Sequence, residues 1–177
     1  MTSPSSWQTS LHQLLNLQGA RPRLAIVGIG NDFRCDDAAG VSIARRLLES
    51  RIITSLRNVL VIDAGHAPEN RTADLRRFAP EVILLIDAAD MDELPGTIRW
   101  IETDEIEGMS ASTHTLPLSM LAKYLTLELN CKIAFIGIQL KSNDVGETLS
   151  TEVAEAVNLL AGNLIELLGS TMAADSQ

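Results

Sequence analysis

Residues 24–40 of the chain read LAIVGIGNDFRCDDAAG. The opening LAIV is a short, continuous apolar run, which is typical of a strand buried on both faces, and Gly28 and Gly30 then end it in a turn. From Asp37 onward, apolar residues recur at helical spacing, and the acids at its start suit the positive end of a helix dipole. The stretch therefore predicts a strand, a loop and a helix in succession.

The same alternation of apolar runs and helical patterns continues along the chain. Residues 97–101 follow the tight turn at Pro95-Gly96, and so short a connection from the preceding strand favours an antiparallel strand at the sheet edge. The other predicted strands are 58–63, 82–87 and 132–140, and the other predicted helices are a short one ending near Phe78, 117–129 and 151–168. We therefore predict an α/β fold, a three-layer αβα sandwich around a mainly parallel, mixed five-stranded sheet.

The chain divides into three parts by composition. Residues 1–23 are rich in Ser, Gln and Arg around a brief amphipathic helical pattern, and are interpreted as an N-terminal extension. Residues 24–168 form a single α/β domain, because no linker long enough to divide them is present. Residues 169–177 are small and polar, which predicts a frayed tail.

The charge balance of the 177 residues is acidic. The 14 Lys and Arg face 23 Asp and Glu, a net charge of −9 that repels phosphate backbones and anionic lipid headgroups. No apolar run approaches the roughly 18 to 20 residues that span a bilayer, and the N-terminus lacks the pattern of a signal peptide. Cys35 and Cys131 are too few for a disulfide framework. We expect a cytoplasmic protein that binds neither nucleic acid nor a membrane.

The glycines after the first strand resemble part of a dinucleotide fingerprint. Phe33 occupies the third glycine position, however, and the acids around it would repel a pyrophosphate. A nucleotide-dependent oxidoreductase built on Gly28 and Gly30 therefore stays the weaker alternative, and we expect no nucleotide cofactor. The sequence also lacks the motifs of P-loop enzymes, serine hydrolases with a nucleophile elbow, and zincins.

Acidic residues follow the first three predicted strands. Asp37 comes after the first strand, Asp63 ends the second and Asp87 ends the third, so all three are expected at the carboxyl edge where open α/β sheets bind ligands. His114 lies in a polar loop that could reach the same edge. Two carboxylates and one imidazole suit a borderline divalent ion such as nickel or zinc, and a cation would offset the repulsion between the acids.

Purely structural roles for the same residues are the alternative to this metal site. A lone acid after a strand is more often a helix cap, and a lone loop histidine usually lies on the surface. Asp36 can cap the helix while Asp37 points into the cleft, or the two can exchange roles. Cys35 is interpreted as structural, and His66 as a solvated turn residue rather than a further ligand.

The ordered set of motifs resembles the [NiFe]-hydrogenase maturation endopeptidases. The opening matches the family's G-x-G-N and D-D-x-x-G pattern, and the likeness runs from about residue 24 to residue 168. Several stretches look most like the formate-hydrogenlyase, or HycI-type, branch. The matching segments after the opening are Ile62-Asp63-Ala64-Gly65, Ala67-Pro68-Glu69-Asn70, Ile86-Asp87-Ala88-Ala89-Asp90-Met91, Pro95-Gly96 and Ser112-Thr113-His114-Thr115-Leu116-Pro117-Leu118.

The resemblance implies an endopeptidase that removes a C-terminal extension from the precursor of the hydrogenase large subunit once nickel has been inserted. By position, it assigns nickel contact to Asp37, Asp87 and His114, and a role in cleavage to Asp63. The family fold, a phosphorylase/hydrolase-like mixed sheet flanked by helices, agrees with the predicted one. The chain departs from the family in its longer N-terminal segment and in His66, where a small hydroxyl residue is usual.

Two mechanisms remain open at this point. The nickel is supplied by the precursor, and it either activates a water that attacks the scissile carbonyl or serves only as a recognition mark. Asp63, or Asp87 if it holds no metal, could accept the proton of the water. The chemistry is therefore of an aspartic or metal-dependent type, and no nucleophile is assigned. A nickel-binding checkpoint or chaperone that uses the same residues without cleaving is the alternative function.

Overall fold

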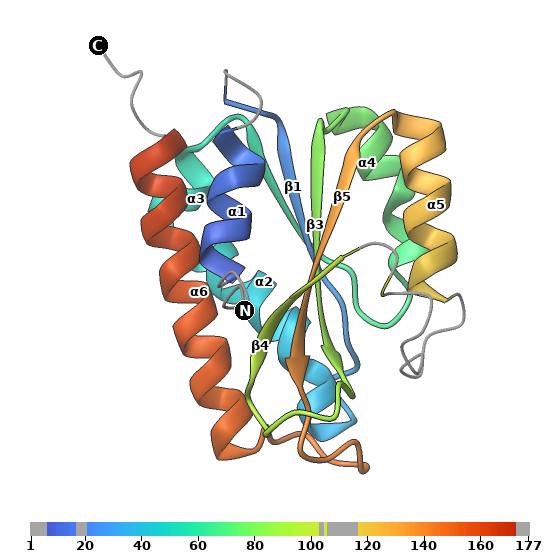
Figure 1. The fold of residues 1–177 in the computed structure, drawn as a ribbon, viewed down its shortest axis with the longest axis vertical. Coiled ribbons are helices and arrows are strands. Elements are labelled where there is room, and N and C mark those ends of the chain that lie inside the picture. Colours follow the sequence, from blue (N-terminus) through green and yellow to red (C-terminus); the bar gives the residue numbers. More distant parts are fainter. Residues whose placement is uncertain (1–6, 17–20, 103–104, 106–116, 173–177) are drawn as a thin grey trace, which may run out of the picture.

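The computed structural model describes residues 7–16, 21–102, 105 and 117–172, and shows a five-stranded sheet between two layers of helices (Figure 1). The strands lie in the order β2-β1-β3-β5-β4. Along the chain the elements are α1 (Trp7–Asn16), β1 (Leu24–Gly28), η1 (Cys35–Ala38), α2 (Ala39–Glu49), α3 (Arg51–Ser55), β2 (Val59–Asp63), η2 (Pro68–Arg71), α4 (Thr72–Phe78), β3 (Val82–Ala89), β4 (Ile98–Ile101), α5 (Leu118–Leu129), β5 (Lys132–Gln139) and α6 (Thr151–Met172), where η marks a 3-10 turn.

The sheet confirms the predicted mixed topology. Strands β2, β1, β3 and β5 are parallel to one another, and β4 runs antiparallel to β5 at the edge. The strand β3 continues two residues beyond the predicted end, so Asp87 lies within the strand and Ala88 and Ala89 follow it. All eight residues of β3 are buried, as expected of a central strand covered on both faces.

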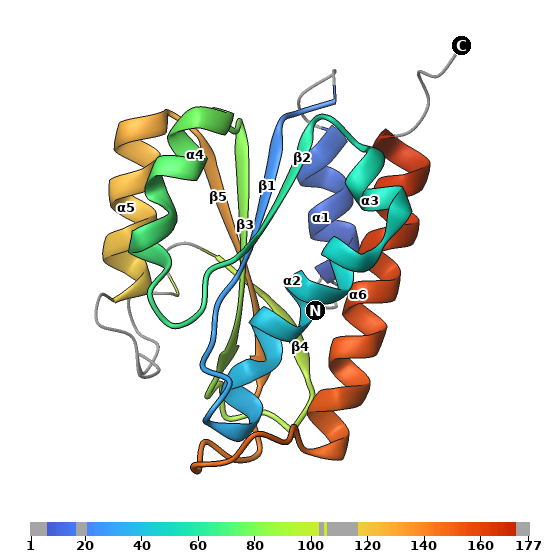
Figure 2. The same cartoon turned by 180° about the vertical axis from the view of Figure 1, so that it is seen from behind.

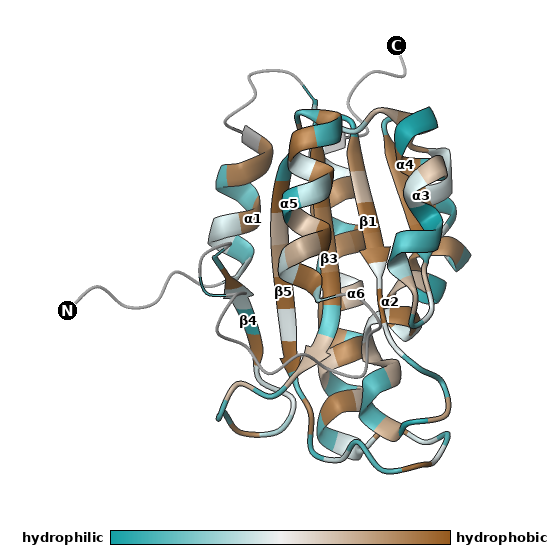
Figure 3. Cartoon of the chain, turned by 90° about the vertical axis from the view of Figure 1, so that its right-hand side faces the viewer, coloured by the Kyte–Doolittle hydropathy of each residue, from teal (hydrophilic) through white to brown (hydrophobic). Residues whose placement is uncertain are grey.

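The two faces of the sheet carry separate apolar cores. Figure 2 shows α1, α2, α3 and α6 on one side of the strands, and α4 and α5 on the other. Ile26, Leu84 and Ile136 point to the first side, whereas Val27, Leu85 and Phe135 point to the second. This alternation is the period of two that every strand imposes on its side chains, and Figure 3 shows the resulting apolar character along the central strands.

Gly28 at the end of β1 and Gly40 in the first turn of α2 allow the helix to pack directly on the strands. A Cβ on Gly40 would lie 2.2 Å from the carbonyl oxygen of Ile29 and 2.3 Å from that of Ile86. A Cβ on Gly28 would lie 2.2 Å from the carbonyl oxygen of Gly40. Backbone packing between helix and strand therefore accounts for the glycine spacing that resembles a dinucleotide fingerprint.

The helices at the two ends of the chain belong to the first core. Trp7, Leu11 and Leu15 of α1 are buried against it, so the helix predicted within residues 1–23 is packed on the domain. The helix α6 is long and apolar enough to cross a membrane by length and composition alone, but Leu160, Leu164 and other apolar residues of it are buried in this core. It ends at Met172, four residues beyond the predicted end at Leu168.

Candidate functional site

Register places Asp63 and Asp87 at neighbouring levels near the carboxyl end of the parallel strands. Gly28, the last residue of β1, is paired with Asp63 on one side and with Ile86 on the other. The strand β1 therefore lies between β2 and β3, and the backbones of the two acids are about 10 Å apart at a strand spacing of about 4.8 Å. The backbone positions of Asp63 and Asp87 therefore lie near one edge of the sheet, as the sequence predicted.

The same register puts the two acids on opposite faces of the sheet. Ile62 points into the core beneath α4 and α5, so the next residue, Asp63, points to the α2 side. Ile86 points into the core beneath α2 and α6, so Asp87 points to the α5 side. The two acids therefore lie near one edge of the sheet but on opposite faces, because Asp63 is level with Ile86 and Asp87 is the next residue along β3.

Asp37 belongs with Asp87 rather than with Asp63. It lies in η1, which packs against β3, and its side chain is completely buried, while that of Asp87 is 1% exposed. The close approach of η1 to the end of β1 depends on Gly30, which has φ +151° and whose Cβ would lie 1.9 Å from the carbonyl oxygen of Asp37. Asp37 and Asp87 are thus two buried carboxylic acids on segments packed against each other.

Asp36 has a structural role that differs from the predicted helix cap. No side chain caps η1 or α2, and the completely buried Asp36 carboxylate instead accepts hydrogen bonds from the loop between β5 and α6. The donors are the N–H of Lys141 at 2.9 Å, that of Ser142 at 3.0 Å, and the N–H and hydroxyl of Ser150 at 2.6 and 3.0 Å. Of Asp36 and Asp37, Asp36 is therefore the acid with the structural role, because it anchors the loop between β5 and α6.

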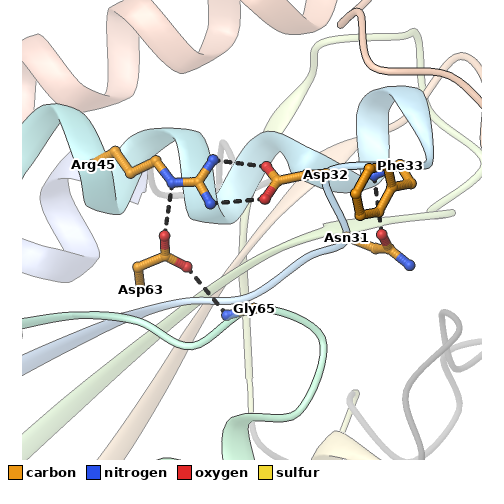
Figure 4. A network of polar contacts seen from close by, with 6 residues as sticks. All are labelled: Asn31, Asp32, Phe33, Arg45, Asp63 and Gly65. Atoms are coloured by element: carbon orange, nitrogen blue, oxygen red, sulfur yellow. Dashed lines mark hydrogen bonds and ion pairs between the residues drawn. The ribbon is translucent and has the colours of Figure 1, made fainter.

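Asp63 is part of an ion-pair network that the sequence did not reveal. Arg45 of α2 donates from Nε to Asp63 at 2.7 Å and from its two Nη atoms to both oxygens of Asp32 at 2.7 and 2.8 Å (Figure 4). The second oxygen of Asp63 accepts from the N–H of Gly65 at 3.2 Å. We call Asp32, Arg45 and Asp63 the Arg45 network.

The Arg45 network shifts the pKa values of Asp32 and Arg45. Hydrogen bonding from Arg45 lowers the pKa of Asp32 below its usual value, and hydrogen bonds to Asp32 and Asp63 raise the pKa of Arg45. The side chains of Arg45, Asp32 and Asp63 are 46%, 48% and 27% exposed. Solvent therefore reaches all three side chains of the network.

His114 lies outside the described residues, so its predicted place beside Asp37 and Asp87 stays a prediction. The helix α5, which begins shortly after it at Leu118, covers the same face of the sheet as Asp87. Within the described ranges, no three His, Cys, Asp or Glu side chains are grouped to hold a metal ion. His66 is exposed, and Cys35 is half-buried next to Gly146, whose carbonyl accepts its N–H.

Comparison with known proteins gives a consistent result. Residues 41–167 match the family model HycI, hydrogenase maturation protease. A putative hydrogenase maturation protease of Methanocaldococcus jannaschii is 39% identical over 150 residues, covering 82% of this chain and 88% of the relative. The hydrogenase 3 maturation protease of Escherichia coli is 37% identical over 112 residues, covering 63% of this chain and 69% of the relative.

Solved structures agree with this assignment. The crystal structure of the [NiFe] hydrogenase maturation protease HycI from Thermococcus kodakarensis superposes with a TM-score of 0.72 at 32% identity, covering 82% of this chain and 92% of that one. The solution structure of the endopeptidase HycI from Escherichia coli has a TM-score of 0.72 at 29% identity, covering 87% and 99%. By sequence and by fold, the chain belongs to the hydrogenase maturation protease family.

Proposed function

We propose that this protease removes the C-terminal extension of a [NiFe]-hydrogenase large-subunit precursor after nickel insertion, and that it acts in the cytoplasm. Membership of the family supports the reaction class. The observation that carries the finer proposal is the pair of buried acids, Asp37 and Asp87, on adjoining segments near the carboxyl end of the sheet.

Asp37 and Asp87 are proposed to contact the nickel ion that the precursor brings. Carboxylate oxygens together with one imidazole, that of His114, make a mixed ligand set suited to a borderline divalent ion. Removing two acids from water is costly when their charges are not balanced, and a bound cation offsets that cost. The nickel is thus part of the substrate.

This charge balance would couple binding to the maturation state of the precursor. A nickel-loaded precursor would bring a cation to these two buried acids, whereas a nickel-free precursor would bring none. We expect the nickel-loaded form to bind about 100-fold more tightly, because only that form adds the attraction between the cation and the two acids. Equal affinity of the two forms would contradict this part of the proposal.

Asp63 remains our proposed catalytic group, acting as the base that takes a proton from the attacking water. Hydrogen bonds from Arg45 Nε and from the N–H of Gly65 orient its carboxyl group at the end of β2. An Asp63→Asn variant should lose roughly 100-fold in cleavage rate, the lower end of what general-base catalysis contributes, while still binding the nickel-loaded precursor. A variant that cleaves at the parental rate would remove Asp63 from the mechanism.

The direct test is mass spectrometry of a purified precursor after incubation with the protein. The account predicts loss of a C-terminal peptide from the nickel-loaded precursor and no loss from the nickel-free one. Tight binding of the nickel-loaded precursor without any cleavage would favour the alternative function, a nickel-binding checkpoint or chaperone. Thermal protection by NAD or NADP would instead support the nucleotide alternative.

A further inference from the structure

The edge strand β2 exposes backbone hydrogen-bonding groups along one side. Its one strand neighbour among the described residues is β1. The N–H of Leu24 in β1 donates to the carbonyl of Asn58, and the N–H of Ala64 donates to the carbonyl of Gly28 in β1. Because a parallel ladder engages alternate residues of a strand, Val61 and Asp63 direct their backbone groups outward, whereas the N–H of Val59 donates to the carbonyl of Leu56. Figure 2 looks onto this edge, with α4 beside it. An open edge of this kind is a template for a further strand.

A groove of about 350 Å³ lies beside this edge, between β2 and α4. Its floor is apolar and includes Leu60, Ile62 and Phe78. The helix α4 runs back antiparallel to β2, so Arg71 lies toward the carboxyl end of the strand, and Arg77 toward its start. The groove therefore follows the strand along most of its length.

The charge of the groove is opposite to that of the protein. Arg23, Arg71 and Arg77 line it with a single acid, Asp74, in a chain whose net charge is −9. The Arg77 side chain is 81% exposed and its contact with Asp74 is long, at 3.6 Å. The pair between Arg71 and Asp74 is closer, at 2.9 Å, and is also partly exposed. Exposed pairs of this kind are weak and exchange readily with another anion.

From these features we propose that β2 and the groove bind an extended acidic peptide by strand addition. Its backbone would pair with the outward groups of Val61 and Asp63, and its acidic side chains on the α4 side would meet Arg71 and Arg77. We assign the occupant as the part of the precursor's C-terminal extension that follows the cut bond. That assignment rests on the proposed function.

The direction of the bound segment follows from the position of the acids. The proposed cleavage chemistry lies at the carboxyl end of β2, near Asp63, so residues beyond the cut bond must run back toward Val59, antiparallel to β2. At about 3.4 Å per residue, an extended segment of about five residues covers the strand and carries its acidic side chains past both arginines.

The test uses short peptides and the full chain. We would titrate an eight-residue peptide of alternating Thr and Glu, capped at both ends, and follow the backbone amides by NMR. The expected result is saturable binding, weakened by salt, that shifts the amides of Val61 and Asp63. The counterpart with Gln in place of Glu should bind about tenfold more weakly, and so should a counterpart methylated at alternate backbone nitrogens.

A matched pair of variants separates the groove from general charge. R71Q/R77Q should weaken binding of the Glu peptide about fivefold to tenfold, as expected for two exposed ion pairs. R46Q/R51Q removes the same charge from α2 and α3, on the other side of the sheet, and should change binding less than twofold. Equal binding of the Gln or methylated peptide, equal loss in both double variants, or no binding at all would overturn the proposal.

A cleavage assay distinguishes failure of this inference from failure of the proposed function. If the protein cleaves the nickel-loaded precursor and R71Q/R77Q cleaves it with the parental KM, the groove does not hold the extension, and the protease proposal stands. If the peptides bind as expected but no precursor is cleaved, strand addition stands, and its assignment to the extension falls.

Discussion

The acids near the carboxyl end of the sheet are held in two different ways. Around the junction of β1 and α2, Asp36, Asp37 and Asp87 are buried. In the Arg45 network, Asp32 and Asp63 are partly exposed and paired with one arginine. Burial makes the acids of the junction expensive to change, whereas the exposed network contributes little to stability. Side chains of the same type can therefore serve the fold in one place and be available for chemistry in another.

The largest effect on stability is expected from Asp36→Ala. The substitution removes the acceptor of three backbone N–H groups and one hydroxyl from a completely buried position, so we expect a loss of about 3–5 kcal/mol in the free energy of unfolding. Urea unfolding measures this loss. Asp32→Ala in the exposed network is the matched control and should lower the free energy of unfolding by less than about 1 kcal/mol. Comparable losses in the two variants would contradict the distinction between buried and exposed acids.

A glycine pair tests how closely the junction is packed. Gly40→Ala places a methyl group against the carbonyl oxygens of Ile29 and Ile86, so we expect a loss of about 3 kcal/mol. Gly162→Ala, in the exposed part of α6, meets no atom within 4 Å and should instead stabilise the protein by about 0.8 kcal/mol. Thermal unfolding of both variants gives the comparison, and a neutral Gly40→Ala would show that α2 can move away from the strands.

The Arg45 network should show the smallest effect, and one that depends on pH. The pKa of Asp32 is lowered in the folded state, so its contribution to stability is present above its unfolded value of 3.8 and is lost as the pH falls through the lower folded value. Arg45→Met should cost at most about 1 kcal/mol at pH 7, because the pair is exposed.

The NMR titration of Asp32 gives a sharper measure of the same network. In Arg45→Met, the carboxyl carbon of Asp32 should titrate at a higher pH than in the parent protein, since the first cause of the lowered pKa has been removed. An unchanged midpoint would mean that the ion pair seen in Figure 4 does not persist in solution.

The fold could be predicted from the sequence because each strand and helix has its own pattern of apolar residues over neighbouring positions. The buried strands are continuous apolar runs, and the antiparallel β4 follows from the short turn at Pro95-Gly96. The site was predicted less completely because its contacts are not local. Asp36 meets Ser150 across 114 residues, and the phase that separates Asp63 from Asp87 depends on the register of β2 and β3 against β1. Arg45 stands on a polar helix face, where nothing in the spacing links it to Asp63.

The central claim is that buried Asp37 and Asp87 recognise the nickel of the precursor, and the most direct measurement is the rate of C-terminal peptide release from nickel-loaded precursor, followed by mass spectrometry. Asp37→Asn and Asp87→Asn preserve side-chain size and should each lower the rate roughly 100-fold or more. Glu155→Gln, on the exposed face of α6, should stay within about twofold of the parent. Parental rates in both buried variants would contradict the account.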